Sequence, residues 1–310
     1  MMRRILLRII QLIFILLILS FLVFLLMYLA PGDAAEKRLM SQGVAVTKEM
    51  LTAERERMGL LRPFFVRYGE WLFGVLRGDF GLSVKDDLPV APKLLAGLKN
   101  TTALAGGSLL LALLFAFPAG ILSAVRQGGI PDHILRILSF AGNSMPNFLL
   151  SILLMYAFCV RIRLFPIIAE GGIEGLVLPS LSLAIPMASR FIRQIRAEIL
   201  TELSAEYVRG MRARGVKERY ILFGNVLRNA SGHILTTIGL QVGTLMGGSV
   251  VVESIFRWPG IGKLVMDSIT ARDYPVIMGF VLVMGTIYVV INLLTDIAYR
   301  MLDPRTSTHA

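Results

Sequence analysis

Six apolar stretches, each close to the length that crosses a lipid bilayer, constrain this sequence more than any other feature. A helix needs about 20 consecutive apolar residues to span the hydrocarbon core. The 310-residue chain is 55% hydrophobic and only 17% charged, which is unusual for a soluble domain of this length. The stretches are Ile9–Ala30, Thr101–Val125, Ile137–Val160, Gly175–Ser189, Ser231–Val252 and Tyr274–Thr295. The sequence therefore predicts an all-α polytopic membrane protein with six transmembrane helices.

Two of these stretches need separate argument. The fourth is short and contains Pro179 and Pro186, so we expect its helix to continue into Arg190–Leu200 beyond the lipid core. The first resembles a secretory signal, but its apolar run is about twice the usual length and no small-x-small cleavage site follows closely. We therefore expect the first stretch to remain as an uncleaved transmembrane helix.

The distribution of Lys and Arg predicts the side on which each short loop lies. Cytoplasmic loops of membrane proteins carry an excess of these residues. With six crossings, segments 1–8, 126–136, 190–230 and 296–310 share one side and hold 16 Lys and Arg, whereas loops 161–174 and 253–273 hold 5. Both termini and segment 190–230 are therefore predicted to be cytoplasmic.

The large loop between the first two stretches has structure of its own. The scheme gives a first transmembrane helix (1–30), an extracytoplasmic loop with short helices (31–100), a five-helix core (101–295) and a cytoplasmic tail (296–310). In the loop, Thr47 is placed to cap a helix that Gly59 would end. A second helix after Pro63 has an apolar stripe made by Phe64, Phe65, Tyr68, Trp71, Leu72, Val75 and Leu76. This stripe indicates a helix that lies on the outer membrane surface or packs against the spans.

Several classes of function are excluded by the residues that are missing. Cys159 stands alone, so neither a disulfide framework nor a cysteine metal site is expected, and no basic and aromatic face indicates nucleic-acid binding. The centres of the six stretches contain no charged residue, whereas ion-driven carriers usually place one at membrane depth. GIGKL (260–264) lacks the spacing and the hydroxyl of a phosphate-binding loop. We therefore expect no catalytic residue, metal or cofactor in this chain and a source of energy outside it.

Small residues recur at four-residue spacing in the fifth stretch. They are Gly239, Gly243 and Gly247, followed by Gly248. Such a stripe lets two helix backbones approach closely where no water drives their association. Packing within the subunit and packing against a second subunit both remain open, and the length of the stripe favours a second subunit.

The densest block of positive charge lies between the fourth and fifth stretches, in EYVRGMRARGVKERYILFGNVLRNA (206–230). Tyr207, Val208 and Met211 share one face of a helix, while charged residues lie towards another. Gly215 predicts the end of this helix, and VKERYILFGNVL can restart at a new angle. This pattern favours a lever whose apolar ridge docks in another protein, the alternative being a basic loop that binds anionic lipid headgroups.

This block resembles the cytoplasmic coupling motif of ABC importer permeases, in the form typical of dipeptide, oligopeptide and nickel importers. In the general motif E-A-A-x3-G-x9-I-x-L-P, Gly215 matches the glycine and Leu227 the leucine, whereas Arg209 and Arg228 replace the glutamate and the proline. Nearly the whole chain is similar to this branch, through MGLLRPFFVRYGEWL (58–72), RGDFGLS (77–83), SMPNF (144–148), ESIFRWPGIGKL (253–264), ARDYPVI (271–277) and DPR (303–305). Asn225 and Met278 differ from the residues that are common in this branch. Within the branch, the chain most resembles the nickel-type permease.

The resemblance implies a type I ABC importer permease fold with a cytoplasmic coupling helix, in the bacterial inner membrane. The implied partners are a homologous second permease, two cytoplasmic ATPase subunits that hold ATP and Mg²⁺, an extracytoplasmic solute-binding protein and membrane lipid, with no nucleic acid. Within region 200–230, the residues implied to contact the ATPase are Glu206, Tyr207, Val208, Arg209, Met211, Arg212, Ala213 and Gly215. The translocation path would include Ser144, Met145, Pro146, Asn147, Gly243 and Gly247, and the binding protein would contact Phe256, Trp258, Pro259 and Gly260.

The expected activity is transport by alternating access, not enzymatic catalysis. We expect nickel or a metal chelate as cargo, because the short loop 161–174 looks more like that of nickel permeases, and a di- or oligopeptide is the alternative. An ion-coupled secondary transporter or channel that works without an ATPase is a rival, as is a membrane scaffold. Only the importer requires a glycine-bent coupling helix and an ATPase partner.

Overall fold

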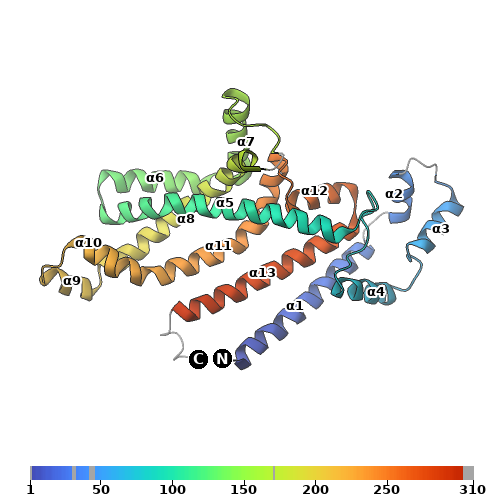
Figure 1. The fold of residues 1–310 in the computed structure, drawn as a ribbon, viewed down its shortest axis with the longest axis horizontal. Coiled ribbons are helices and arrows are strands. Elements are labelled where there is room, and N and C mark those ends of the chain that lie inside the picture. The colour runs from blue at the N-terminus through green and yellow to red at the C-terminus, as the bar shows by residue number, and fades with distance from the viewer. Residues whose placement is uncertain (1, 30–32, 42–45, 170–171, 303–310) are drawn as a thin grey trace. The chain divides into compact units, whose positions relative to one another are not determined.

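The computed structural model describes residues 2–29, 33–41, 46–169 and 172–302, and the regular elements in them are helices (Figure 1). The chain forms two compact units, described separately here: unit 1 is residues 1–99 with 260–290, and unit 2 is residues 100–259 with 291–310. Unit 1 contains α1 (Met2–Leu29), α2 (Ala34–Ser41), α3 (Lys48–Arg57), α4 (Phe64–Leu76) and α12 (Ile261–Ala271). Unit 2 contains α6 (Ile130–Ser144), α7 (Asn147–Met155), α8 (Gly172–Leu203), α9 (Glu206–Ala213), α10 (Glu218–Tyr220), α11 (Leu227–Phe256) and two π-helical segments, η1 (Tyr156–Arg161) and η2 (Ile221–Val226). Helices α5 (Val90–Val125) and α13 (Tyr274–Leu302) contribute residues to both units.

Four of the described helices are long and apolar enough to cross a membrane alone. They are Ile10–Leu29 of α1, α5, α8 and Tyr274–Leu294 of α13, and the bent series α6, α7 and η1 makes a fifth if it is counted as one span. The remaining predicted stretch lies in α11, whose 30 residues extend roughly 45 Å at 1.5 Å per residue. The all-α membrane fold is confirmed, and the count of six spans remains a prediction.

The fourth predicted helix is confirmed, whereas several other boundaries are wrong. α8 runs from Gly172 to Leu203 with both prolines inside it, as its sequence predicts. α5, however, begins at Val90 instead of Thr101, α13 continues to Leu302, and α12 occupies part of the segment predicted as a loop. An apolar run marks only the part of a helix that lipid would surround. An apolar run therefore does not show helical turns that carry polar residues at either end of a helix. Residues 303–310 of the predicted tail lie outside the described residues.

The third predicted stretch, Ile137–Val160, is not one continuous helix. α6 ends at Ser144 and α7 begins at Asn147, with a bend of 99° between the two parts. Met145 is extended (φ −82°, ψ 124°), as sterics favour for a residue before proline, and Pro146 has no N–H to continue the helix. The third predicted transmembrane helix is therefore corrected to two helices joined at SMPN.

The outer-loop predictions in unit 1 are confirmed at the level of single helices. Thr47 Oγ1 accepts a hydrogen bond from Met50 N at 3.3 Å and caps α3. Gly59 has a φ of +66° just after the end of α3, a conformation that glycine adopts without steric cost. α4 then begins directly after Pro63, as predicted.

Part of the apolar stripe of α4 packs against α1, which was one of the two open alternatives. Phe64, Tyr68 and Trp71 make ring contacts with Phe21, Phe24 and Tyr28 of α1, the closest with centroids 5.0 Å apart. The hydroxyls of Tyr68 and Ser20 lie 2.8 Å apart, so the same contact includes a hydrogen bond. Phe65 and Leu76, which belong to the predicted stripe, remain exposed together with the neighbouring Phe73, so α4 also presents an apolar surface outward.

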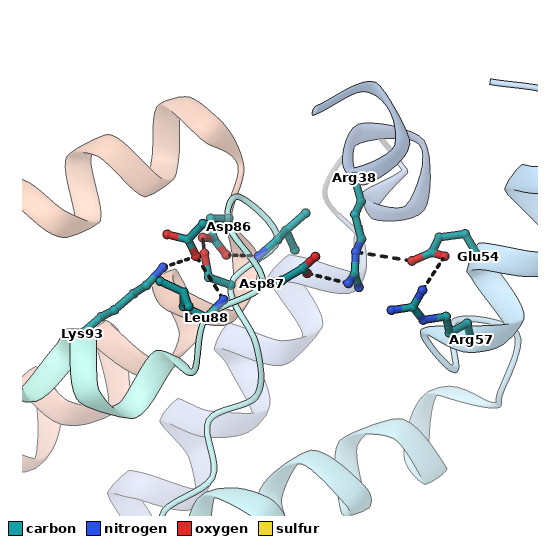
Figure 2. A network of polar contacts seen from close by, with 10 residues as sticks. Arg38, Glu54, Arg57, Asp86, Asp87, Leu88 and Lys93 are labelled. Atoms are coloured by element: carbon teal, nitrogen blue, oxygen red, sulfur yellow. Dashed lines mark hydrogen bonds and ion pairs between the residues drawn. The ribbon is translucent and has the colours of Figure 1, made fainter. Parts of the chain in front are cut away.

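A network of charged side chains connects the remaining outer-loop elements of unit 1 (Figure 2). Arg38 of α2 lies 3.4 Å from Glu54 of α3 and 2.5 Å from Asp87, which precedes α5. Lys93 in the first turn of α5 pairs with Asp86. Arg38 and Glu54 are largely buried, so water screens this pair less than a surface pair. The network therefore holds α2 and α3 to the segment that leads into α5.

We predict opposite effects for two glycine substitutions on α5. A Cβ at Gly97 would lie 2.9 Å from the backbone of Ile261, whereas a Cβ at Gly106 meets nothing within 4 Å. Gly97→Ala should destabilise the fold by roughly 1–3 kcal/mol, because α12 must move away. Gly106→Ala should be neutral or stabilising by up to about 1 kcal/mol, because alanine favours a helix. Thermal unfolding of the purified protein in detergent measures both, and equal midpoints would refute the predicted close approach of α5 and α12.

Candidate functional site

The predicted coupling helix forms as α9, and it ends at Gly215 as predicted. Gly215 has a φ of +75°, and its N–H donates to Arg212 O at 2.9 Å. The N–H of Val216 donates to Met211 O at 3.1 Å. These two bonds form a Schellman motif, in which a left-handed glycine satisfies carbonyls that a helix end would leave unpaired. The chain therefore turns sharply between α9 and α10.

The apolar face of α9 is directed mainly into this chain. Val208 has no exposed surface and belongs to the core cluster that includes Ile199 of α8 and Ile221 of η2. Met211 is half-buried against the same cluster. Tyr207 is exposed, and its hydroxyl donates to Glu202 Oε2 at 2.7 Å. The expected docking ridge is therefore corrected: Val208 has no surface to offer a partner, because it fixes α9 to the end of α8.

The exposed face of α9 is polar and mostly cationic. Its exposed residues include Glu206, Arg209, Gly210, Arg212 and Ala213. Arg212 makes a two-fold contact with Glu218 of α10, with Nε–Oε1 at 2.6 Å and Nη2–Oε2 at 3.1 Å. The side chain of Arg209 makes no hydrogen bond or ion pair with the described residues. Arg209 is therefore the cation of this face that is available to a partner.

The Arg212–Glu218 pair closes the turn at Gly215 from the outside. The hydrogen bonds from Arg212 hold the pKa of Glu218 below its ordinary value. A lowered carboxylate pKa means that the pair is intact at neutral pH and is lost only as the pH falls through that lowered value. Both side chains are exposed, so the pair contributes little to stability.

Sequence reasoning missed a buried ion pair that ties α8 to two other helices of unit 2. Asp132 of α6 is fully buried and binds Arg196 of α8 through two contacts, of 2.7 and 2.9 Å. It also accepts hydrogen bonds from Ser123 Oγ of α5 at 2.5 Å and from Gly128 N at 2.9 Å. The lone acid beside the turn Gly128–Gly129 was the available signal, since a carboxylate near free loop amides readily accepts them. This cluster joins the ends of α5 and α6 to the helix that carries α9.

The residues expected along a translocation path fall on three helices. Ser144 and Pro146 are exposed at the bend, Met145 and Asn147 are half-buried, and the Ser144 hydroxyl donates to Phe140 O. α7 packs against both α8 and α11. On α11, Gly243 is buried, while Gly247 is exposed and a Cβ there would meet nothing within 4 Å. The bend and the glycine helix are therefore neighbours, and their role in a path stays a prediction.

The expected contacts with a binding protein are mostly inside the protein. Phe256 and Trp258 are buried in the core, and the indole N–H of Trp258 donates to Asn100 O at 3.1 Å. Gly260 is also buried, so only Pro259 of the four expected residues is exposed. The correction has a simple cause: large aromatic side chains beside a helix end stabilise the fold most when they fill the core.

A buried acid next to these residues was also missed. Glu253 lies in the last turns of α11 and has no exposed surface. Its Oε1 accepts hydrogen bonds from Thr101 Oγ1 at 2.7 Å and Ser249 Oγ at 2.9 Å. Hydrogen bonds of this kind lower the cost of burying a carboxylate. Glu253 therefore holds α11 against α5 within unit 2.

The described residues contain no group of three or more His, Cys, Asp or Glu that could hold a metal ion.

We predict that the left-handed backbone at Gly215 controls the stability of α9. Gly215→Ala should strain the turn by roughly 1–2 kcal/mol, because a Cβ is disfavoured at positive φ. Gly210→Ala is the matched control, since neither glycine has an atom within 4 Å of its Cβ position and Gly210 is helical. Hydrogen exchange of amides 206–213 should become about tenfold faster in the first variant and no faster in the second. Equal exchange in both variants would contradict this account of the turn.

Comparisons with known proteins assign the chain to a family. Residues 116–308 match the binding-protein-dependent transport system inner membrane component family, and residues 1–102 match its N-terminal domain family. A glutathione transport system permease of Escherichia coli K12 is 36% identical over 297 residues, covering 96% of each chain, and its Salmonella typhi counterpart is 38% identical with the same coverage. A proposed peptide permease protein of Brucella ovis is 36% identical over 304 residues, covering 94% of each chain.

Solved structures support the same fold at lower sequence identity. An inward-facing structure of the MetNI methionine ABC transporter has a TM-score of 0.55 and 20% identity, covering 68% of this chain and 96% of that one. An amino acid ABC transporter solved with histidines has a TM-score of 0.54 and 16% identity, covering 68% and 94%. The chain has the type I importer fold, belongs to the binding-protein-dependent transport system inner membrane component family, and is a permease subunit of an ABC importer, not an enzyme.

Proposed function

We propose that this permease moves a short peptide or peptide-like solute into the cytoplasm, and that α9 receives the movement of a separate ATPase. The observation that carries the proposal is the construction of α9: one face is anchored in the core by Val208, and the other presents Arg209, whose side chain has no partner among the described residues. A helix built in this way cannot move alone. A push on its exposed face must move the helices that hold it.

The contacts of unit 2 define the path of that movement. α9 follows α8 after only two residues, and the Arg212–Glu218 pair and the Gly215 turn connect α9 to α10, η2 and α11. The Asp132–Arg196 pair extends the connection from α8 to α5 and α6. Because packed helices shift as units between discrete arrangements, displacement of α9 would change the angles of both α8 and α11. Those helices flank α7 and the bend at Pro146.

The proposed partners follow from the surfaces that unit 2 leaves open. A homologous second permease would pack against the exposed part of the glycine stripe on α11, where Gly247 and Gly248 meet nothing within 4 Å. Two ATPase subunits, which bind ATP and Mg²⁺, would contact α9 in the cytoplasm. Both termini of the permease would lie on the same side of the membrane. A solute-binding protein would deliver cargo on the opposite side, with Pro259 as the exposed residue of the expected contact.

A peptide-like cargo is favoured over nickel by the relatives. The proteins that match most of this chain are described as glutathione and peptide permeases. The nickel or metal-chelate cargo expected from the short loop 161–174 remains the second candidate, supported by that loop length alone. The described residues of this chain hold no cluster of metal ligands, so selection of a metal would have to occur in the binding protein.

We predict that Arg209→Glu uncouples transport while leaving the fold intact. Arg209 is exposed and makes no side-chain bond within the described chain, so charge reversal should lower ATP-driven uptake at least about tenfold through repulsion at the ATPase surface. Lys85→Glu, an equal charge change at an exposed outer-loop residue, is the control. Uptake by the reconstituted four-component transporter and membrane abundance of the permease are both measured. Normal uptake by Arg209→Glu would remove the coupling assignment.

The cargo prediction is tested on the complete transporter in vesicles. We expect labelled glutathione or a dipeptide to accumulate only when binding protein, both permeases, ATPase and ATP are all present, and unlabelled peptide to compete with it. Accumulation of ⁶³Ni²⁺ without peptide, unaffected by peptide competition, would overturn the cargo proposal and favour the metal. Transport in vesicles that contain permease without ATPase would instead overturn the importer mechanism in favour of a self-sufficient carrier or channel.

A further inference from the structure

A cavity of about 310 Å³ lies within unit 1. Its walls come from the last turns of α1, from α4 and from the first turns of α13. Figure 1 shows α4 beside the end of α1, in agreement with their ring contacts. The cavity walls are mostly apolar and include Phe24, Met27, Pro275 and Met278.

Two residues that line this cavity carry hydrogen-bond donors without acceptors among the described residues. The Trp71 indole nitrogen is buried and has no partner. The Arg67 guanidinium is half-buried, lies 5.7 Å from the centre of the Tyr28 ring and makes no ion pair or hydrogen bond with the described chain. Burial lowers the pKa of Arg67, although the group remains charged at any physiological pH. A buried donor without an acceptor is costly, so the site calls for an anionic or strongly accepting group.

The surroundings of the cavity are suited to lipid. α1 is one of the helices able to span a membrane, and its outward side chains Leu22, Leu26 and Leu29 are exposed. The outward face of α4 presents Phe65, Phe73 and Leu76, with exposed fractions of 74%, 56% and 77%. An amphipathic helix whose outer face is this apolar lies at a membrane interface, where Trp, Tyr and Arg side chains gather at the level of the headgroups. The opening of the cavity is therefore expected at headgroup depth.

We propose that this cavity is a binding site for a phospholipid, whose phosphate accepts hydrogen bonds from Arg67 and the Trp71 indole. The upper part of an acyl chain would lie along Phe24, Met27 and Met278. Arginine is well suited to phosphate because its guanidinium can donate two parallel hydrogen bonds. In the orientation proposed above, the lipid belongs to the outer leaflet. The site is independent of cargo and of the ATPase.

The chemistry of the cavity also indicates the headgroup. The carboxylate of Glu70 lines the cavity and pairs with Arg62 at 2.5 Å. It would repel a free phosphate ion or a doubly anionic ligand, but it can accept a hydrogen bond from an ammonium group. A free anion would moreover leave the apolar side chains of the cavity exposed to water. A phospholipid with an ammonium headgroup, such as phosphatidylethanolamine, satisfies the donors, the carboxylate and the apolar wall together.

Native mass spectrometry of the complete transporter, titrated with phosphatidylethanolamine, tests this proposal. We expect Arg67→Gln and Trp71→Phe to weaken binding at one site per copy of this permease by at least about tenfold. Arg77→Gln is the matched control, because Arg77 follows the same helix, stacks on Phe73 and does not line the cavity. Equal lipid binding by Arg67→Gln and Arg77→Gln would overturn the site. If Arg67→Gln fails to assemble, Trp71→Phe, which keeps an aromatic ring but lacks the indole N–H, still decides the question.

Ligand fragments separate the possible sources of the signal. Diacylglycerol has the same chains without phosphate, and glycerophosphoethanolamine has the headgroup without chains. Each is expected to bind at least about tenfold more weakly than the intact lipid. Equal binding of diacylglycerol would show a merely apolar pocket, and equal binding of glycerophosphoethanolamine or inorganic phosphate would show an anion site. Either result overturns the proposal.

Glu70→Gln should reduce the preference for phosphatidylethanolamine over phosphatidylglycerol, and an unchanged preference would overturn the headgroup assignment.

Discussion

The constraint on which the whole structure depends is that lipid offers no hydrogen-bond partner to a peptide backbone. Long helices satisfy their own backbones, so each place where a helix stops must supply other partners for the exposed groups. The described breaks follow this rule closely. Arg257 and Arg272 stop α11 and α12 in the left-handed conformation that Gly215 also adopts in the exposed turn after α9. Their following residues, Trp258 and Asp273, donate back to the carbonyls of Glu253 and Ser268.

The same constraint explains where the fold places its buried acids. Asp132 and Glu253 in unit 2 and Asp273 in unit 1 are almost fully buried, and each lies near the end of a helix rather than at its centre. Each accepts hydrogen bonds from side-chain hydroxyls or loop amides: Ser123 Oγ and Gly128 N for Asp132, Thr101 Oγ1 and Ser249 Oγ for Glu253, and Ser83 Oγ and Val84 N for Asp273. An acid in this position joins a helix end to an element far away in the sequence. The joints are therefore polar, while the helices between them are apolar.

Features that depend on neighbouring residues could be read from the sequence, and those that depend on distant partners could not. The cap at Thr47, the glycine ends at Gly59 and Gly215 and the helix after Pro63 each follow from a few adjacent side chains. The bend at Pro146 was missed because apolar composition continues through it, although proline itself was a signal. The Asp132–Arg196 pair spans 64 positions in the chain, so no local pattern could reveal it. Val208 and Trp258 were expected on surfaces, because an apolar side chain beside charged residues is compatible with a docking ridge as well as with a core. Only the three-dimensional structure shows that both side chains are buried.

The burial of Val208 bears directly on the coupling role proposed for α9. An apolar ridge that docked in a partner would hold the two proteins together strongly, but it would leave α9 weakly attached to its own permease. The structure has the opposite distribution: apolar contacts fix α9 to α8 and η2, and charged groups face outward. Charged contacts at an exposed surface are individually weak and adjust readily as the partner moves. In the proposed coupling, a strong internal anchor with an adaptable external face would pass on displacement through many cycles, because the contact that must stay fixed is the one inside the chain.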